Sequence, residues 1–137
     1  MVTIIDMTSE LAKLTMFHGR TPTTPPAARA GSSARLADYR DGGIFVSKSA
    51  GRGDWERHPE GEEIVQILDG SAILHLVTEE GPQSVTLTAG TLAIVPQGAW
   101  HRFECPEGVT LMTVTPQPSE HLREDVADPR TVPAPPR

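Results

Sequence analysis

Short runs in which apolar and polar residues alternate fill the middle of the chain, from about residue 43 to residue 115. Alternation with a period of two is typical of strands that bury one face. We predict eight such strands, at 43–48, 54–58, 63–68, 71–77, 84–88, 92–96, 100–104 and 109–115. Ten of the twelve glycines lie between Gly42 and Gly108, mostly where turns would separate these runs. Short strands with no helical period between them indicate an all-β fold, either an antiparallel sandwich or a small barrel.

The two ends of the chain differ from the middle in composition and in the pattern of apolar residues. Thr8 or Ser9 is a suitable cap for a short helix that ends by Gly19. Residues 20–33 are rich in Pro, Thr and Ala, which predicts an extended arm that is either a flexible leader or packs on the barrel or on a partner subunit. Six prolines after Thr115 predict an extended tail. The expected organisation is an N-terminal arm, a barrel and a C-terminal extended tail, at 1–40, 41–115 and 116–137.

Composition narrows the class of protein. A chain of 137 residues suits one domain with a modest core. A net charge of −6 and a pI near 5.3 disfavour a nucleic-acid partner, which requires a basic face. We find neither an apolar run of about 20 residues nor the pattern of a signal peptide, so we expect no membrane partner. The single cysteine, Cys105, excludes an intrachain disulfide, and the expectation is a soluble, cytoplasmic protein.

Three polar residues stand near strand ends in a way that suggests a shared site. Glu56 and His58 are two residues apart, so on a strand their side chains leave by the same face. His101 follows the turn that contains Pro96 and Gly98. If the sheet folds over on itself, these side chains converge inside it.

Two spaced motifs then resemble those of the cupin superfamily. One reads Gly90-x(5)-Pro96-x-Gly98-x(2)-His101, and the other keeps the spacing His58-x(4)-Glu63-x(6)-Gly70. The resemblance covers about 40–115. It implies a double-stranded β-helix, which is a small jelly-roll barrel and often a homodimer.

In metal-bearing cupins the matching positions hold a divalent ion, so the resemblance implies a metal site at Glu56, His58, Glu63 and His101. Two positions depart from the pattern: Glu56 replaces its first histidine, and Cys105 replaces the asparagine that closes the second motif. Two imidazoles with one or two carboxylates remain a sound divalent site, which favours Fe²⁺, Mn²⁺, Ni²⁺ or Zn²⁺ over Cu(I). Glu56 is a fourth ligand, a general base beside the ion, or a solvated charge at a strand end.

A metal-free barrel is the alternative, in which His58 and His101 are polar pocket residues. Two buried carboxylates without an ion repel each other, so one must take a proton, be solvated or pair with arginine.

Three candidate functions follow from these interpretations. The first is a metal-dependent enzyme of the dioxygenase or isomerase type, acting on a small organic molecule. The second is a ligand-binding or sensory barrel without catalysis, and the third is a structural dimer that exchanges its arms.

Four further residues have simpler interpretations. Trp55 and Trp100 flank the motifs and are expected to pack at strand starts rather than to wall a pocket. His75, in an alternating run, is expected to be a hydrogen-bonded histidine of the sheet. His121 lies in the predicted tail, where we expect it on the surface.

Overall fold

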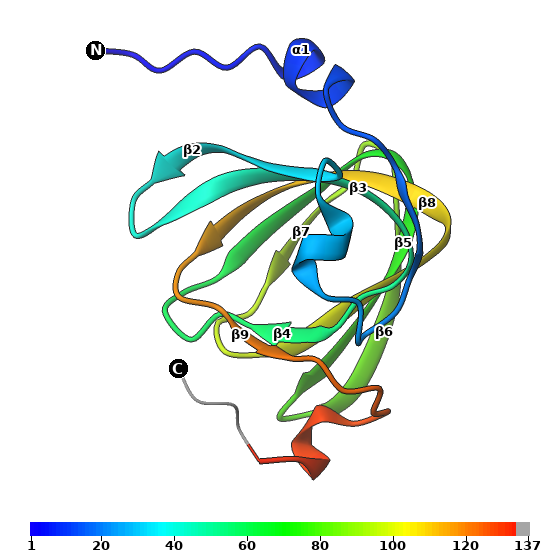
Figure 1. The fold of residues 1–137 in the computed structure, drawn as a ribbon. Coiled ribbons are helices and arrows are strands. Elements are labelled where there is room, and N and C mark those ends of the chain that lie inside the picture. The colour runs from blue at the N-terminus through cyan, green and yellow to red at the C-terminus, as the bar shows by residue number, and fades with distance from the viewer. Residues whose placement is uncertain (134–137) are drawn as a thin grey trace.

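The computed structural model describes residues 1–133, and these form a nine-stranded sheet that curls into a barrel (Figure 1). The longest strand, β8, lies at its centre and pairs antiparallel with β3 along one edge and with β5 along the other. The strands are β1 Phe17–Arg20, β2 Ser33–Tyr39, β3 Gly42–Arg52, β4 Trp55–Arg57, β5 Glu63–Thr78, β6 Gly81–Thr88, β7 Leu92–Val95, β8 Trp100–Pro116 and β9 Glu120–Leu122. The predicted all-β barrel is therefore confirmed.

At two places where we predicted a turn between two strands, the structure has one continuous strand. The runs 63–68 and 71–77 form one continuous β5, and the runs 100–104 and 109–115 form one continuous β8. Gly70 and Gly108 have φ angles of +77° and +95°, and the pairing between the two strands shifts register near Gly70. A side chain on Gly70 would collide with the Gly108 carbonyl. These glycines let the paired strands bend around the barrel, which is why a turn signal appears inside a strand.

The N-terminal helix is shorter than predicted. Helix α1 spans Met7–Ala12, and its cap is Asp6, whose side chain accepts a hydrogen bond from the Ser9 amide at 3.1 Å. The predicted cap at Thr8 or Ser9 is therefore wrong, and the helix ends well before Gly19 because β1 begins at Phe17. Among residues 1–133, no helix combines the length and the apolar character needed to cross a membrane.

Much of the segment before residue 42 belongs to the sheet. Strand β1 pairs parallel with β3, and β2 pairs antiparallel with β3. Between them the 3-10 helix η1, Pro26–Arg29, lies across the open end of the barrel (Figure 1). Beyond β8, strand β9 pairs with β4, and the 3-10 helix η2 spans Pro129–Thr131. Of the Pro-rich tail, residues 134–137 lie outside the described residues.

Two apolar clusters hold the barrel together. The larger fills the interior with alternate residues of the long strands, as the period of two predicts: Val65, Ile67, Leu74, Leu76, Val109 and Leu111. The smaller contains Trp55, Trp100, Val77 and Leu122, with Val126 packed against it. The Trp55 indole N–H donates to the Val126 carbonyl at 2.9 Å. Both tryptophans are thus packing residues, as expected.

Candidate metal centre

The barrel contains a cavity of about 360 Å³, at the low end of the volumes of small-molecule sites. Glu56, His58 and Glu63 line this cavity, and His101 is fully buried beside them. Glu56 lies in β4 directly opposite His101 of β8, whereas Glu63 is the first residue of β5. His58 follows the end of β4. Three strands therefore bring the four predicted residues to one point, and one ligand atom from each lies within 4.8 Å of the others.

The imidazoles and carboxylates of this cluster interleave. His101 Nε2 lies 3.2 Å from Glu63 Oε1 and 3.4 Å from Glu56 Oε1. His58 Nε2 lies 3.1 Å from Glu63 Oε2 and 3.8 Å from Glu56 Oε1. The two imidazole centroids are 5.1 Å apart. Both Nε2 atoms thus face the same pair of carboxylates, which is the convergence that the sequence predicted.

Burial and close contact shift the pKa values of the cluster in opposite directions. Burial alone raises the pKa of Glu63, but hydrogen bonds from His101 and His58 outweigh it and lower that pKa to about 2. Burial alone lowers the pKa of His101, but hydrogen bonds to Glu56 and Glu63 raise it to about 10. Without an ion, the cluster is therefore a buried imidazolium–carboxylate pair. The repulsion that we expected to be relieved by a protonated carboxylate, solvent or arginine is relieved instead by a histidine.

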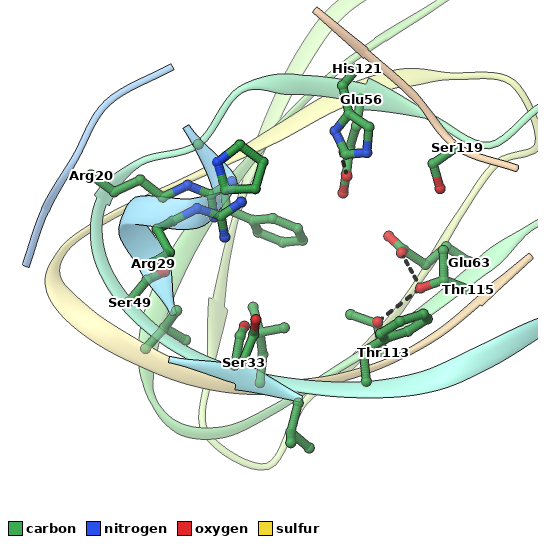
Figure 2. A pocket seen from close by; sticks show the side chains of 18 of the residues that line it. Arg20, Arg29, Ser33, Ser49, Glu56, Glu63, Thr113, Thr115, Ser119 and His121 are labelled. Atoms are coloured by element: carbon green, nitrogen blue, oxygen red, sulfur yellow. Dashed lines mark hydrogen bonds and ion pairs between the residues drawn. The ribbon is translucent and has the colours of Figure 1, made fainter. Parts of the chain in front are cut away.

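Outer hydrogen bonds fix the orientation of three of these side chains. His101 Nδ1–H donates to the Ala99 carbonyl at 3.0 Å, and His58 Nδ1 lies 2.8 Å from the Ser119 hydroxyl. The Thr115 hydroxyl donates to Glu63 Oε2 at 2.6 Å (Figure 2). In metal sites the second ring nitrogen of a ligating histidine is held in this way, which leaves Nε2 for the metal.

The donor set and the convergence of its ligand atoms fit a divalent metal ion. His58 Nε2 is buried, and its contacts are the carboxylate oxygens of Glu63 and Glu56 at 3.1 and 3.8 Å. Two imidazole nitrogens with one or two carboxylate oxygens are the ligands that Fe²⁺, Mn²⁺, Ni²⁺ and Zn²⁺ accept. The four side chains therefore form a group that could hold a metal ion, whose identity the donor set leaves open.

Other predicted positions have mixed outcomes. His75 makes hydrogen bonds with Ser84 and Glu104 at 2.7 and 2.9 Å, so the prediction of a sheet histidine is confirmed. Cys105 is buried in the interior cluster. The prediction for His121 is wrong, because its side chain lines the cavity and its Nδ1 lies 2.9 Å from Asp54 Oδ2. The strand β9 brings it there, and a three-residue strand leaves too short an alternation to be read from sequence.

Sequence reasoning also missed the residues that support the site. Thr113 and Thr115 belong to the run 109–115, whose odd-numbered positions face inward together with Leu111. Polar residues at inward positions of a predicted strand were a usable signal. Ser119 carried no such signal, because only the fold places it behind His58.

Comparisons with known proteins agree with this architecture. The model of the cupin domain family matches residues 44–115, which is more than half of the chain. A cupin-2 domain containing protein from Shewanella frigidimarina has 19% identity and a TM-score of 0.61, over 83% of this chain and 95% of that one. A Neisseria meningitidis protein has 18% identity and a TM-score of 0.62, over 84% of this chain and all of that one.

A third solved structure is an enzyme of known activity. Hydroquinone 1,2-dioxygenase from a Sphingomonas species, with 4-hydroxybenzoate bound, has 16% identity and a TM-score of 0.53, over 63% of this chain and 65% of that one. At these identities the likeness shows the fold. No curated protein sequence matches the chain. The matched family model and the barrel together show that the chain belongs to the cupin family.

Proposed function

We propose that the protein holds a divalent metal ion on His58, Glu63 and His101 and acts as a metal-dependent enzyme on a small organic molecule. The observation that carries this proposal is the convergence of four ligand atoms within 4.8 Å beside a cavity of about 360 Å³. The near-complete burial of His58, Glu63 and His101 beside that cavity supports it further. The reaction is of the dioxygenase or isomerase type, both of which occur on this fold.

Each residue of the cluster has a distinct part in this proposal. A divalent ion supplies Lewis-acid chemistry, and redox chemistry with O₂ if it is iron. His58, Glu63 and His101 are almost completely buried and are its three principal ligands. Glu56 is the most exposed of the four, at 24%, and faces the cavity. It is therefore either a fourth ligand or the general base that takes a proton from the substrate.

Elemental analysis tests the metal directly. Protein purified without chelator or a nickel column is expected to carry close to one equivalent of ion. His58→Ala and His101→Ala are expected to lose at least about 90% of it, since removal of a ligand destroys the site. His75→Ala is the matched control, because it removes a histidine from the outside of the barrel. Equal metal contents in wild type and all three variants would sink the proposal.

A non-enzymatic binding barrel is the second candidate. It is favoured by the contacts within the cluster, because the carboxylates of Glu56 and Glu63 each lie against the His101 imidazole, which can balance their charge. This candidate predicts a ligand-dependent rise in melting temperature that EDTA does not change and that no turnover accompanies. The enzyme predicts turnover that EDTA abolishes.

We also propose that the protein is a homodimer, on the strength of an apolar row on the outer face of the sheet. Ile94, Ile64, Val114 and Ile44 are register partners on four neighbouring strands, and Ile64 points away from the buried Val65. Ile94 is 57% exposed. Ile94→Glu is expected to convert the dimer to a monomer in light scattering, whereas a monomeric wild type would refute the proposal. The cytoplasmic location remains a prediction from composition.

A further inference from the structure

Three arginines line the cavity beside the ligand cluster. Arg20 ends β1, Arg29 ends η1, and Arg123 follows β9. Figure 2 shows Arg20 and Arg29 reaching in from one side, with Glu63 and Thr115 on the other side. One cavity thus has a cationic end and a carboxylate–imidazole end.

These arginines differ in whether a protein carboxylate neutralises them. Arg20 Nη2 lies 2.9 Å from Asp54 Oδ1, and Arg123 Nε lies 3.9 Å from Asp54 Oδ2. Asp54 Oδ2 also lies 2.9 Å from His121 Nδ1, so both carboxylate oxygens of Asp54 already have partners. The Arg29 side chain has no hydrogen bond or ion pair with any described residue, and its Nε is buried without a partner. Burial and the nearby Arg20 charge both lower the pKa of Arg29, which an incoming anion would offset.

Apolar side chains also line this cavity. Phe45, Phe103, Val109 and Leu111 line the cavity together with Arg29 and Glu56. Arg29 and Glu56 thus line one and the same cavity. A molecule that spans the cavity would therefore have a cation at one end, the cluster at the other, and apolar side chains along the wall.

We propose that Arg29 binds the carboxylate of a small apolar monocarboxylic acid, whose other end reaches the ligand cluster. This inference rests on the proposed function and names the substrate class of the same site. A planar carboxylate matches a guanidinium through two parallel hydrogen bonds. With a divalent ion bound, the carboxylates of Glu56 and Glu63 offset its charge, so the far end of the cavity offers no net positive charge for a second anionic group. Desolvation of a guanidinium with no other partner strengthens the selection for an anion.

Paired ligands that differ only in charge test this inference. Phenylacetate and butanoate are each titrated against their primary amides, phenylacetamide and butanamide, by calorimetry on the protein as purified. We expect each acid to bind at least about tenfold more tightly than its amide, as for a charge-assisted hydrogen-bonded pair. Arg29→Gln is expected to reduce this ratio to about twofold or less, and Arg29→Lys to retain part of it. Failure of both acids to bind at about 10 mM would overturn the inference.

Two controls separate the arginine from the metal and from general charge effects. Arg52→Gln removes the same charge from an exposed arginine that pairs with Asp125, outside the cavity, and should leave the ratio unchanged. Metal content and melting temperature should be the same in Arg29→Gln as in wild type. If the ratio survives Arg29→Gln but is lost with EDTA, the carboxylate binds the metal, and the inference fails while the proposed function stands. If the ratio depends on Arg29 in a protein that holds no metal, the inference stands and the enzyme proposal fails.

Discussion

Two histidine–carboxylate clusters on the same pair of strands differ mainly in burial. Inside the barrel, Glu63 of β5 contacts His101 of β8, and their side chains are 3% and 0% exposed. On the outside, His75 of β5 contacts Glu104 of β8, and their side chains are 25% and 39% exposed. The distances are similar, at 3.2 and 2.9 Å.

Their expected chemistry nevertheless differs. Water and salt screen the outer pair, which leaves it little influence on stability. In the inner pair burial opposes the charged forms, but the hydrogen bonds within the cluster outweigh it, so the pKa values of Glu63 and His101 move to about 2 and about 10. A histidine and a glutamate in contact are therefore not a site in themselves. Burial, convergence with a second imidazole and an adjoining cavity make the inner cluster a candidate for metal binding.

The largest effect is expected from Glu63→Gln. This change keeps the size of the side chain but leaves two buried imidazoles without their shared carboxylate. Breaking a buried pair in this way should lower the free energy of unfolding by about 3 kcal/mol, measured by urea titration in EDTA. Metal content should fall as well. A loss below about 1 kcal/mol would show that the inner pair is no more important than a surface pair.

The same pair should make the stability of the metal-free protein depend on pH. The pKa of Glu63 falls from 4.5 to about 2, so its contribution is complete above pH 4.5 and is lost as the pH falls through about 2. The pKa of His101 rises from 6.5 to about 10, so its contribution is complete below pH 6.5 and is lost as the pH rises through about 10. Urea titrations in EDTA should show stability decreasing from pH 6.5 to 10 in wild type, with this component absent from His101→Ala. Identical slopes in the two proteins would contradict the assignment.

An intermediate effect is expected from Thr115→Val, which removes the hydroxyl that donates to Glu63 Oε2. Loss of a buried hydrogen bond to a charged group should cost about 2 kcal/mol in urea titration. Metal affinity should fall about tenfold, because Glu63 loses the partner that orients it. Thr110→Val, a buried threonine of the same strand outside the cluster, is the control. Equal metal affinities in the two variants would argue against an orienting role.

The smallest effect is expected from Glu104→Gln, the counterpart of Glu63→Gln in the outer pair. Its stability should stay within about 0.5 kcal/mol of wild type, because the contact with His75 is exposed to solvent. Its metal content should be unchanged. A loss comparable with that of Glu63→Gln would remove the distinction between the two clusters.

The barrel and the convergence of the four polar side chains could be predicted from the sequence, because both depend on local pattern. Alternation predicted the strands, and the motif spacing predicted that Glu56, His58, Glu63 and His101 converge, as they do. The prediction of a turn at Gly70 was wrong, because a glycine with positive φ can form a bend inside a strand as well as a turn between strands. Arg29 had no sequence signal, because its position depends on a 3-10 helix that crosses the barrel opening.

Anomalous X-ray diffraction from a metal-loaded crystal tests the central claim most directly. The account predicts a single strong anomalous peak about 2.0–2.3 Å from His58 Nε2, His101 Nε2 and a Glu63 oxygen. The distance from that peak to Glu56 then decides whether Glu56 is a ligand or a base. A peak elsewhere, or none at this point in a crystal grown with excess divalent ion, would contradict the account.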